Sequence, residues 1–162
     1  MGMMFDVWPF HRRTDFWLQG STEKGGYDFH DGENITYEGD GEFLTDVLTT
    51  KAVEVISGHD AETPLFLYLT YQAPHAPITT PPQKYLQQYA DQGLFQGTSD
   101  TDRERRERYG TVSALDHGVG KVVAALKGAG LYDNSVVVFT TDNGADQVHA
   151  ANYPLRGGKQ QL

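Results

Sequence analysis

The chain has 162 residues, the length of one ordinary domain and enough to enclose a hydrophobic core. Its 22 acidic residues outnumber its 13 basic residues, and the net charge of −9 argues against a nucleic-acid partner while leaving room for a bound cation or a cationic surface partner. The sequence contains no cysteine, which excludes disulfides, thiolate metal sites and thiol nucleophiles.

The amino-terminal part, residues 1–42, is rich in glycine, aromatic and charged residues without clear periodicity, so we expect loops with short strands. Its opening, MGMMFDVWPFHRR, lacks the long apolar run and the cleavage site of a signal peptide. No window of the sequence is apolar enough to predict a membrane span. Asn34-Ile35-Thr36 is a glycosylation sequon, which matters only if the chain enters the secretory pathway, and such a triplet also arises by chance.

A helix and a strand are predicted next. Apolar residues recur every three or four positions from Leu44 to Ile56, and Gly58 follows where a helix should end. Pro64 then opens PLFLYLTY, a continuous apolar and aromatic run typical of a buried strand. The following QAPHAPITTPP contains four prolines and is expected to be irregular, because proline lacks a backbone donor and blocks a helix.

A second helix and a second strand follow the charged stretch DRERRER. Six apolar residues at helical spacing predict one buried helix face: Tyr109, Val112, Leu115, Val119, Val122 and Leu126. Gly128 and Gly130 end this helix, and the apolar run 136–141 predicts the strand. Strand, helix and strand in this order form a crossover that makes the two strands parallel. We therefore expect residues 43–162 to form an α/β core with site loops, in which helices flank a mostly parallel sheet.

Polar side chains follow the carboxyl end of each predicted strand, where α/β proteins place their sites. His75 follows the first strand, and Asp142-Asn143-Gly144 follows the second. Asp-Asn-Gly is a common turn sequence, but a carboxylate beside an amide oxygen also suits Ca²⁺ or Mg²⁺. Arg156 and Lys159, in YPLRGGK, are either a solvated charge pair or a cradle for an anion. Together these residues predict a site for a divalent cation and a tetrahedral anion.

Three segments in order, PLFLYLTYQAPHAP, VSALDHGVGKVVAALKGAGLYDNSVVVFTTDNGA and NYPLRGGK, resemble the calcium-dependent sulfatases, especially the arylsulfatase B-like branch. The resemblance runs from about Tyr27 to the end. It implies an alkaline phosphatase-like α/β fold, sulfate ester substrates (aryl or glycan) and a lysosomal or secreted location. For single residues it implies Ca²⁺ ligands at Asp142 and Asn143, protonation of the leaving oxygen by His75, and contact of Lys159 with the sulfate. We expect His75 and Arg156 to contact the substrate as well.

Two parts of the family pattern have no counterpart in this sequence. The family's nucleophile is a formylglycine made in a Cys/Ser-x-Pro-x-Arg motif, and neither that motif nor the early Asp-Asp metal pair occurs. Residues 1–162 thus resemble the later part of a sulfatase catalytic domain, cut at both sides, with an incomplete fold and a partial Ca²⁺ site. We expect no hydrolysis of sulfate esters by this chain alone.

Two other functions stay open: a non-catalytic anion- or calcium-binding remnant, and a phosphoester hydrolase of the same superfamily. Leu115-Asp116-His117-Gly118 is similar to a metal motif of related phosphodiesterases and mutases, but it falls inside the predicted second helix. Its side chains cannot follow a strand end there, so we do not expect it to bind a metal.

Overall fold

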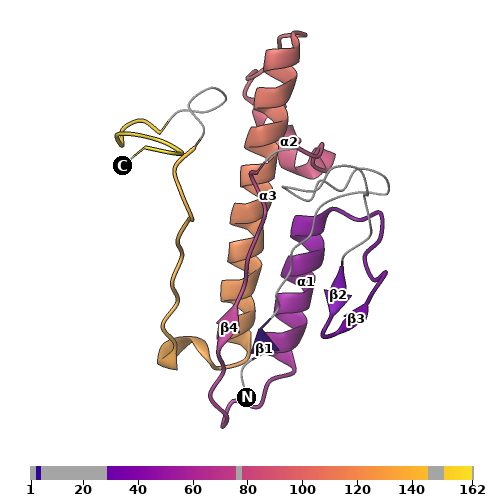
Figure 1. Cartoon of the computed structure of the whole chain (residues 1–162), viewed down its shortest axis with the longest axis vertical. Helices are drawn as coiled ribbons and strands as arrows, with labels where there is room; N and C mark the ends of the chain where they lie inside the picture. The colour runs from indigo at the N-terminus through magenta and orange to yellow at the C-terminus, as the bar shows by residue number, and fades with distance from the viewer. Residues whose placement is uncertain (1–2, 5–28, 76–77, 146–151, 162) are drawn as a thin grey trace.

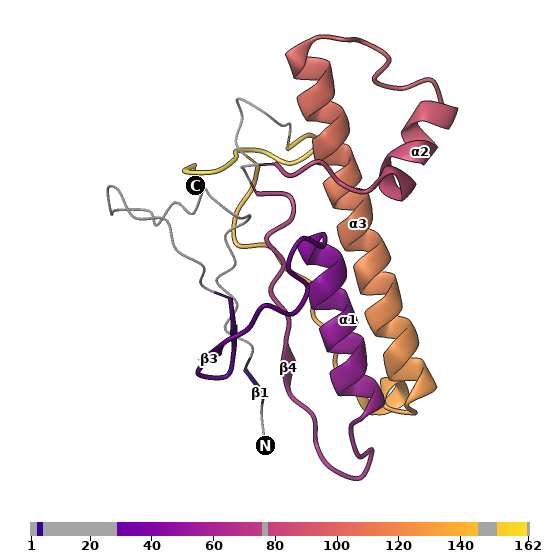
Figure 2. The same ribbon diagram turned by 90° about the vertical axis from the view of Figure 1, so that its right-hand side faces the viewer.

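The chain was analysed as a computed structural model that describes residues 3–4, 29–75, 78–145 and 152–161. In these ranges the elements run in the order β1 (Met3–Met4), β2 (His30–Asp31), β3 (Asn34–Ile35), α1 (Leu44–Ser57), β4 (Leu67–Tyr68), α2 (Gln83–Asp91), α3 (Asp100–Gly128) and the 3₁₀ turn η1 (Tyr132–Asn134). Helices α1 and α3 run side by side, and β4 lies along one face of the pair (Figures 1 and 2). None of the helices in the described part is long and apolar enough to cross a membrane.

The first predicted helix is confirmed. Helix α1 begins at Leu44, and Gly58 caps its end by donating its amide to the carbonyl of Glu54 at 2.9 Å. Its buried apolar residues are Val47, Leu48, Ala52 and Ile56, and Ile56 is 0% exposed. Burying an isoleucine fully contributes about 1.5–3 kcal/mol, so this face is a main source of stability for the helix layer.

The second predicted helix ends at Gly128 as expected, but it begins earlier than expected. Helix α3 starts at Asp100, so it includes the charged stretch that was expected to precede it. The Ser99 hydroxyl caps this start by accepting the Asp102 amide at 3.1 Å. Ion pairs along the helix, such as that of Arg108 with Glu104 at 3.2 Å, hold charged residues in helical geometry.

The buried face of α3 differs from the predicted one. Tyr109 and Val112 are 50% and 45% exposed, and the residues that α3 buries are mostly small: Gly110, Thr111, Ala114, Gly118 and Leu126. The physical reason is the close approach of α1. A Cβ atom at Gly118 would lie 2.6 Å from the Thr49 hydroxyl oxygen, so a larger residue cannot occupy this position, whereas Leu126 is buried as predicted.

Helix α2 was not predicted. It follows Pro81 and Pro82 directly, and it packs on α3 by burying Tyr85 and Leu86. The prolines were interpreted only as a block to regular structure, although proline is also well suited to the start of a helix. The rest of the proline-rich segment, 72–82, contains no helix or strand among its described residues, as expected.

The predicted sheet is formed only in small part. The strand expected in PLFLYLTY is restricted to β4, which pairs in parallel with β1, and β2 pairs with β3 in a hairpin. The run 136–141 is extended but belongs to no strand among the described residues, and Val136 and Val138 are 92% and 77% exposed (Figure 1). A strand needs a neighbouring backbone to bond with, so the parallel arrangement expected for this run and PLFLYLTY stays a prediction.

Candidate functional site

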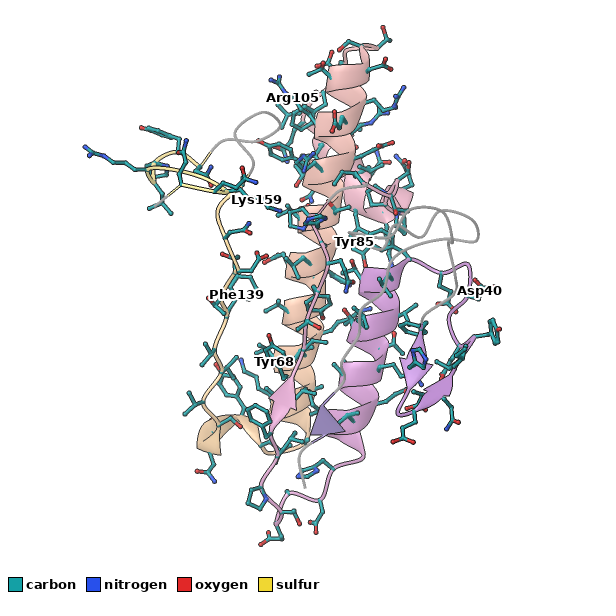
Figure 3. The ribbon with its side chains drawn as sticks, in the orientation of Figure 1. Asp40, Tyr68, Tyr85, Arg105, Phe139 and Lys159 are labelled. Carbon is teal, nitrogen blue, oxygen red and sulfur yellow. The ribbon has the colours of Figure 1, made fainter. Side chains whose placement is uncertain are left out.

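His75 and Lys159, which are 84 positions apart in the chain, meet in the structure. The ammonium nitrogen of Lys159 lies 3.5 Å from Nε2 of His75, and both residues are exposed. An ammonium group has donors only, so it bonds to Nε2 when that nitrogen carries no proton. Figure 3 shows Lys159 on the side of the carboxyl-terminal loop that faces α3. A tetrahedral anion at this point would contact a fixed positive charge and an imidazole together.

The Asp142-Asn143-Gly144 turn lies directly after the extended run 136–141. One carboxylate oxygen of Asp142 accepts the backbone amide of Asn143 at 2.8 Å. The side-chain amide of Asn143 donates to the carbonyl of Gly144 at 2.9 Å, which leaves its side-chain oxygen available as an acceptor. Both residues are exposed. These contacts fix the turn so that a carboxylate and an amide oxygen are presented next to each other.

The turn and the loop of Lys159 are bonded to each other through Ala145. The amide of Lys159 donates to the Ala145 carbonyl at 3.0 Å. Asn152 adds two reciprocal bonds, because its side-chain oxygen accepts the Ala145 amide at 2.7 Å and its side-chain nitrogen donates to the Ala145 carbonyl at 3.1 Å. No sequence pattern indicates this role of Asn152, since an asparagine in a loop is common.

The segment that carries His75 is also attached to the helix layer. Arg108 of α3 donates to the carbonyl of Pro74 at 3.4 Å, and its side chain is only 17% exposed. Earlier in the same segment, the Tyr71 hydroxyl lies 2.9 Å from the Thr49 hydroxyl of α1. Burial raises the pKa of Tyr71 above its ordinary value, so this hydroxyl stays neutral and able to donate. Helices α1 and α3 therefore both position the loop of His75.

The donor chemistry of the turn suits Ca²⁺, but the number of donors is small. Asp142 and Asn143 present oxygens, which a hard cation prefers, whereas Ca²⁺ takes about six to eight of them. In the described part of the chain, no group of three or more His, Cys, Asp and Glu side chains is arranged to hold a metal. The described residues thus provide at most part of a calcium coordination sphere.

The other candidate residues from the sequence make none of the hydrogen bonds described above. Arg156 is exposed in the same loop as Lys159. Asn34 is exposed in β3, at the turn of the β2–β3 hairpin. Asp116 and His117 lie inside α3, as expected, and the His117 ring packs edge-on against Tyr85 with centroids 5.7 Å apart. Both side chains are exposed on the helix surface.

The described residues thus combine a helix layer with short strands, and they bring His75 and Lys159 together in a loop pair that is bonded to the Asp142-Asn143 turn through Ala145. The profile of the sulfatase family matches residues 5–162. The chain therefore belongs to the sulfatase family.

Curated relatives include Arylsulfatase J of Mus musculus, which is 34% identical over 83% of this chain, and N-acetylgalactosamine-6-sulfatase of Mus musculus, which is 36% identical over 72%. The chain spans 21% of the length of each. Among solved structures, Ps i-CgsB is 35% identical over 73% of this chain, with a TM-score of 0.61, and this chain covers 25% of it. A crystal structure of Ps i-CgsB in complex with k-i-k-neocarrahexaose is similar to the same degree, with a TM-score of 0.60. These similarities support the predicted α/β fold class, while the arrangement of its sheet stays a prediction.

Proposed function

We propose that this chain carries the leaving-group acid and the sulfate contacts of a sulfuric ester hydrolase, and that it does not hydrolyse sulfate esters by itself. The observation that carries the proposal is the contact of Lys159 with His75 at 3.5 Å. The Lys159 ammonium would stabilise the charge on a sulfate group, and Arg156 on the same loop would add to the field. The substrates would be sulfate esters of aryl or glycan alcohols.

His75 would act on the departing alkoxide. An imidazole that holds a proton on Nε2 can donate it to the leaving oxygen, which lowers the barrier to cleavage of the sulfur–oxygen bond. Lys159 cannot bond to a protonated Nε2, so it would turn to the sulfate oxygens when His75 is charged. Asp142 and Asn143 would supply some of the oxygen ligands of a Ca²⁺ ion, which when bound supplies positive charge next to the sulfate.

The chain's own residues do not include the family's nucleophile. No Cys/Ser-x-Pro-x-Arg motif occurs in the sequence, and the Thr140 hydroxyl donates to the Thr141 carbonyl at 3.4 Å rather than to a base. Removal of a nucleophile from a cooperating set of groups typically eliminates most of the rate acceleration. The pair His75 and Lys159 therefore supports binding of the sulfate group and proton donation, but not its transfer.

Two assays on the purified 162-residue chain test this function. Titration with inorganic sulfate should show binding that is weakened by Lys159→Ala and unaffected by Lys121→Ala, a matched control at an exposed lysine of α3. Incubation with an aryl sulfate should give no steady turnover, whereas joining an amino-terminal segment with the missing motif should create activity that His75→Ala removes. Turnover by the unmodified chain that is lost in Lys159→Ala would refute the proposal.

A non-catalytic role in binding anions or Ca²⁺ is the second candidate, and the incomplete nucleophile and cation sets favour it. The joined protein distinguishes the two candidates: if it binds sulfate but hydrolyses no ester, the binding role is the correct one. A phosphoester hydrolase of the same superfamily would instead turn over an aryl phosphate.

The proposal extends to location. Lysosomal or secreted compartments fit the family resemblance, and in either one the exposed Asn34 would be an accessible glycosylation acceptor. Expression in a secretory host should then give a product that loses mass on treatment with an N-glycosidase, and Asn34→Gln should lack this change. A product without N-linked glycan would contradict this part of the proposal.

A further inference from the structure

We propose that Asn152 is a positioning residue that fixes Lys159 relative to the Asp142-Asn143 turn, so that binding of a cation at the turn and of an anion at Lys159 are coupled. This inference rests on the proposed function, because it assigns the two ions to those two places. Asn152 itself would touch neither ion.

The contacts of Asn152 explain how it can act at a distance. Its side-chain oxygen accepts the amide of Ala145 at 2.7 Å and its side-chain nitrogen donates to the Ala145 carbonyl at 3.1 Å, so it pairs with both polar groups of one residue. The same carbonyl accepts the amide of Lys159 at 3.0 Å. Ala145 is three positions after Asp142, and therefore one short stretch of backbone carries the turn and receives the Lys159 loop.

Close packing between the Asp142-Asn143-Gly144 turn and the Lys159 loop prevents the two from moving independently. A Cβ atom at Gly144 would lie 2.9 Å from the side-chain oxygen of Asn152 and 3.2 Å from Cα of Gly158. The backbone of the turn thus lies directly against the residue before Lys159. Asn152 is only partly exposed, which shields its bonds to Ala145 from competing water. A shift of the turn must move the Lys159 loop with it.

Such a connection predicts coupled binding. A cation that orders Asp142 and Asn143 would also order Lys159, and the anion would then bind with less loss of conformational freedom. Coupling between two sites is commonly worth about a fivefold change in affinity or more, and it is reciprocal. Without the Asn152 side chain, each ion would keep its direct ligands and the Lys159 amide its bond to Ala145, but Ala145 would lose the two bonds that hold it in place, so ordering of one loop would order the other less.

The test uses the 162-residue chain, labelled for NMR and titrated with inorganic sulfate in the absence and presence of millimolar Ca²⁺. We expect Ca²⁺ to lower the Kd for sulfate about fivefold in the parent chain, and less than about twofold in Asn152→Ala. Asn152→Asp keeps the acceptor for the Ala145 amide and should retain an intermediate coupling. Asn134→Ala, an asparagine of η1 outside the site, is the matched control and should behave as the parent chain.

Two further measurements separate the outcomes. Hydrogen exchange of the Lys159 amide should accelerate in Asn152→Ala, while the resonances of α1 and α3 should not move. Coupling that persists at full strength in Asn152→Ala refutes this inference alone, and so does a general loss of structure in both Asn152 variants, since the hydrogen bonds of the Asn152 side chain within the described residues go to Ala145. Failure of the parent chain to bind sulfate or Ca²⁺ refutes the proposed function and this inference together.

Discussion

Gly118 of α3 lies close to both α1 and the segment that leads to His75. A Cβ atom at this position would lie 2.6 Å from the Thr49 hydroxyl oxygen and 3.0 Å from the Tyr71 hydroxyl oxygen. Those two hydroxyls are bonded to each other at 2.9 Å. Gly118→Ala would therefore force α1 and α3 apart or break the bond between Thr49 and Tyr71.

The expected loss of stability follows from three effects. Alanine is favoured over glycine inside a helix by about 1 kcal/mol, which opposes the loss. Overpacking of a buried position costs about 1–3 kcal/mol. Loss of the Thr49–Tyr71 bond costs about 1 kcal/mol more, because the Tyr71 hydroxyl would lose this partner, although the Thr49 hydroxyl keeps its bond to the Thr45 carbonyl. The free energy of unfolding should thus fall by about 1–3 kcal/mol.

Urea unfolding followed by circular dichroism measures this change, and Gly120→Ala is the matched control. Position 120 lies in the same helix, and a Cβ atom there would have no neighbouring atom within 4 Å beyond its chain neighbours and the nearby backbone of the helix. The free energy of unfolding of this control should therefore rise by about 1 kcal/mol. Because Tyr71 precedes His75 in one segment, Gly118→Ala should also weaken sulfate binding. Equal stabilisation by both substitutions would show that the close approach at Gly118 does not exist in solution.

Three other substitutions test the charges and exposed surfaces. Ser99→Ala removes the cap of α3 and should lower the free energy of unfolding by about 1 kcal/mol, with Ser135→Ala as a comparison at a loop hydroxyl. Burial tends to raise the pKa of Asp46, but hydrogen bonds from Tyr85 and Lys84 outweigh it and lower the pKa below its ordinary value. The stability that ionised Asp46 contributes is therefore fully present above the pKa of this carboxyl in the unfolded chain, about 3.9, and is lost as the pH falls through its lower pKa in the folded chain. Asp46→Asn should remove this contribution and flatten the acid side of a stability–pH curve. Val138→Lys places a charge on a side chain that is 77% exposed, and sedimentation velocity should show less self-association with unchanged stability.

Local patterns in the sequence predicted those features that depend on neighbours in the chain. The repeat from Leu44 to Ile56 predicted α1, and Gly58 predicted its end, because an amphipathic helix needs only its own residues to specify its period. The prolines around His75 predicted an irregular loop for the same reason. The meeting of His75 with Lys159 followed from the expectation that loops beyond strand ends gather at one place.

Features that depend on distant partners were missed. The buried face of α3 is set by how closely α1 approaches, so Gly118 is inside and Val112 is outside, contrary to their hydrophobicity. The role of Asn152 depends on Ala145 being within reach, which no local pattern reveals. The run 136–141 was predicted to be a buried strand from its composition alone, but a strand also needs backbone partners, and none is bonded to it in the described part of the chain.

One physical explanation would cover both the exposed run 136–141 and the small number of oxygen donors at the cation site proposed for Asp142 and Asn143. A further parallel strand paired with this run would place its own carboxyl end beside Asp142, because the carboxyl ends of parallel strands meet at one edge of a sheet. Acidic residues at that end would add the oxygens that a Ca²⁺ ion still needs around Asp142 and Asn143, and the strand would cover Val136 and Val138, now 92% and 77% exposed. We therefore expect that joining an apolar strand followed by acidic residues to the amino-terminal side raises the thermal midpoint and the Ca²⁺ affinity together. A joined strand with its acidic residues replaced by asparagine and serine is the control, and it should raise the midpoint alone. The explanation would be refuted if Ca²⁺ bound more tightly while the 136–141 amides stayed unprotected from hydrogen exchange. The added ligands would then reach Asp142 without pairing of the new strand to this run.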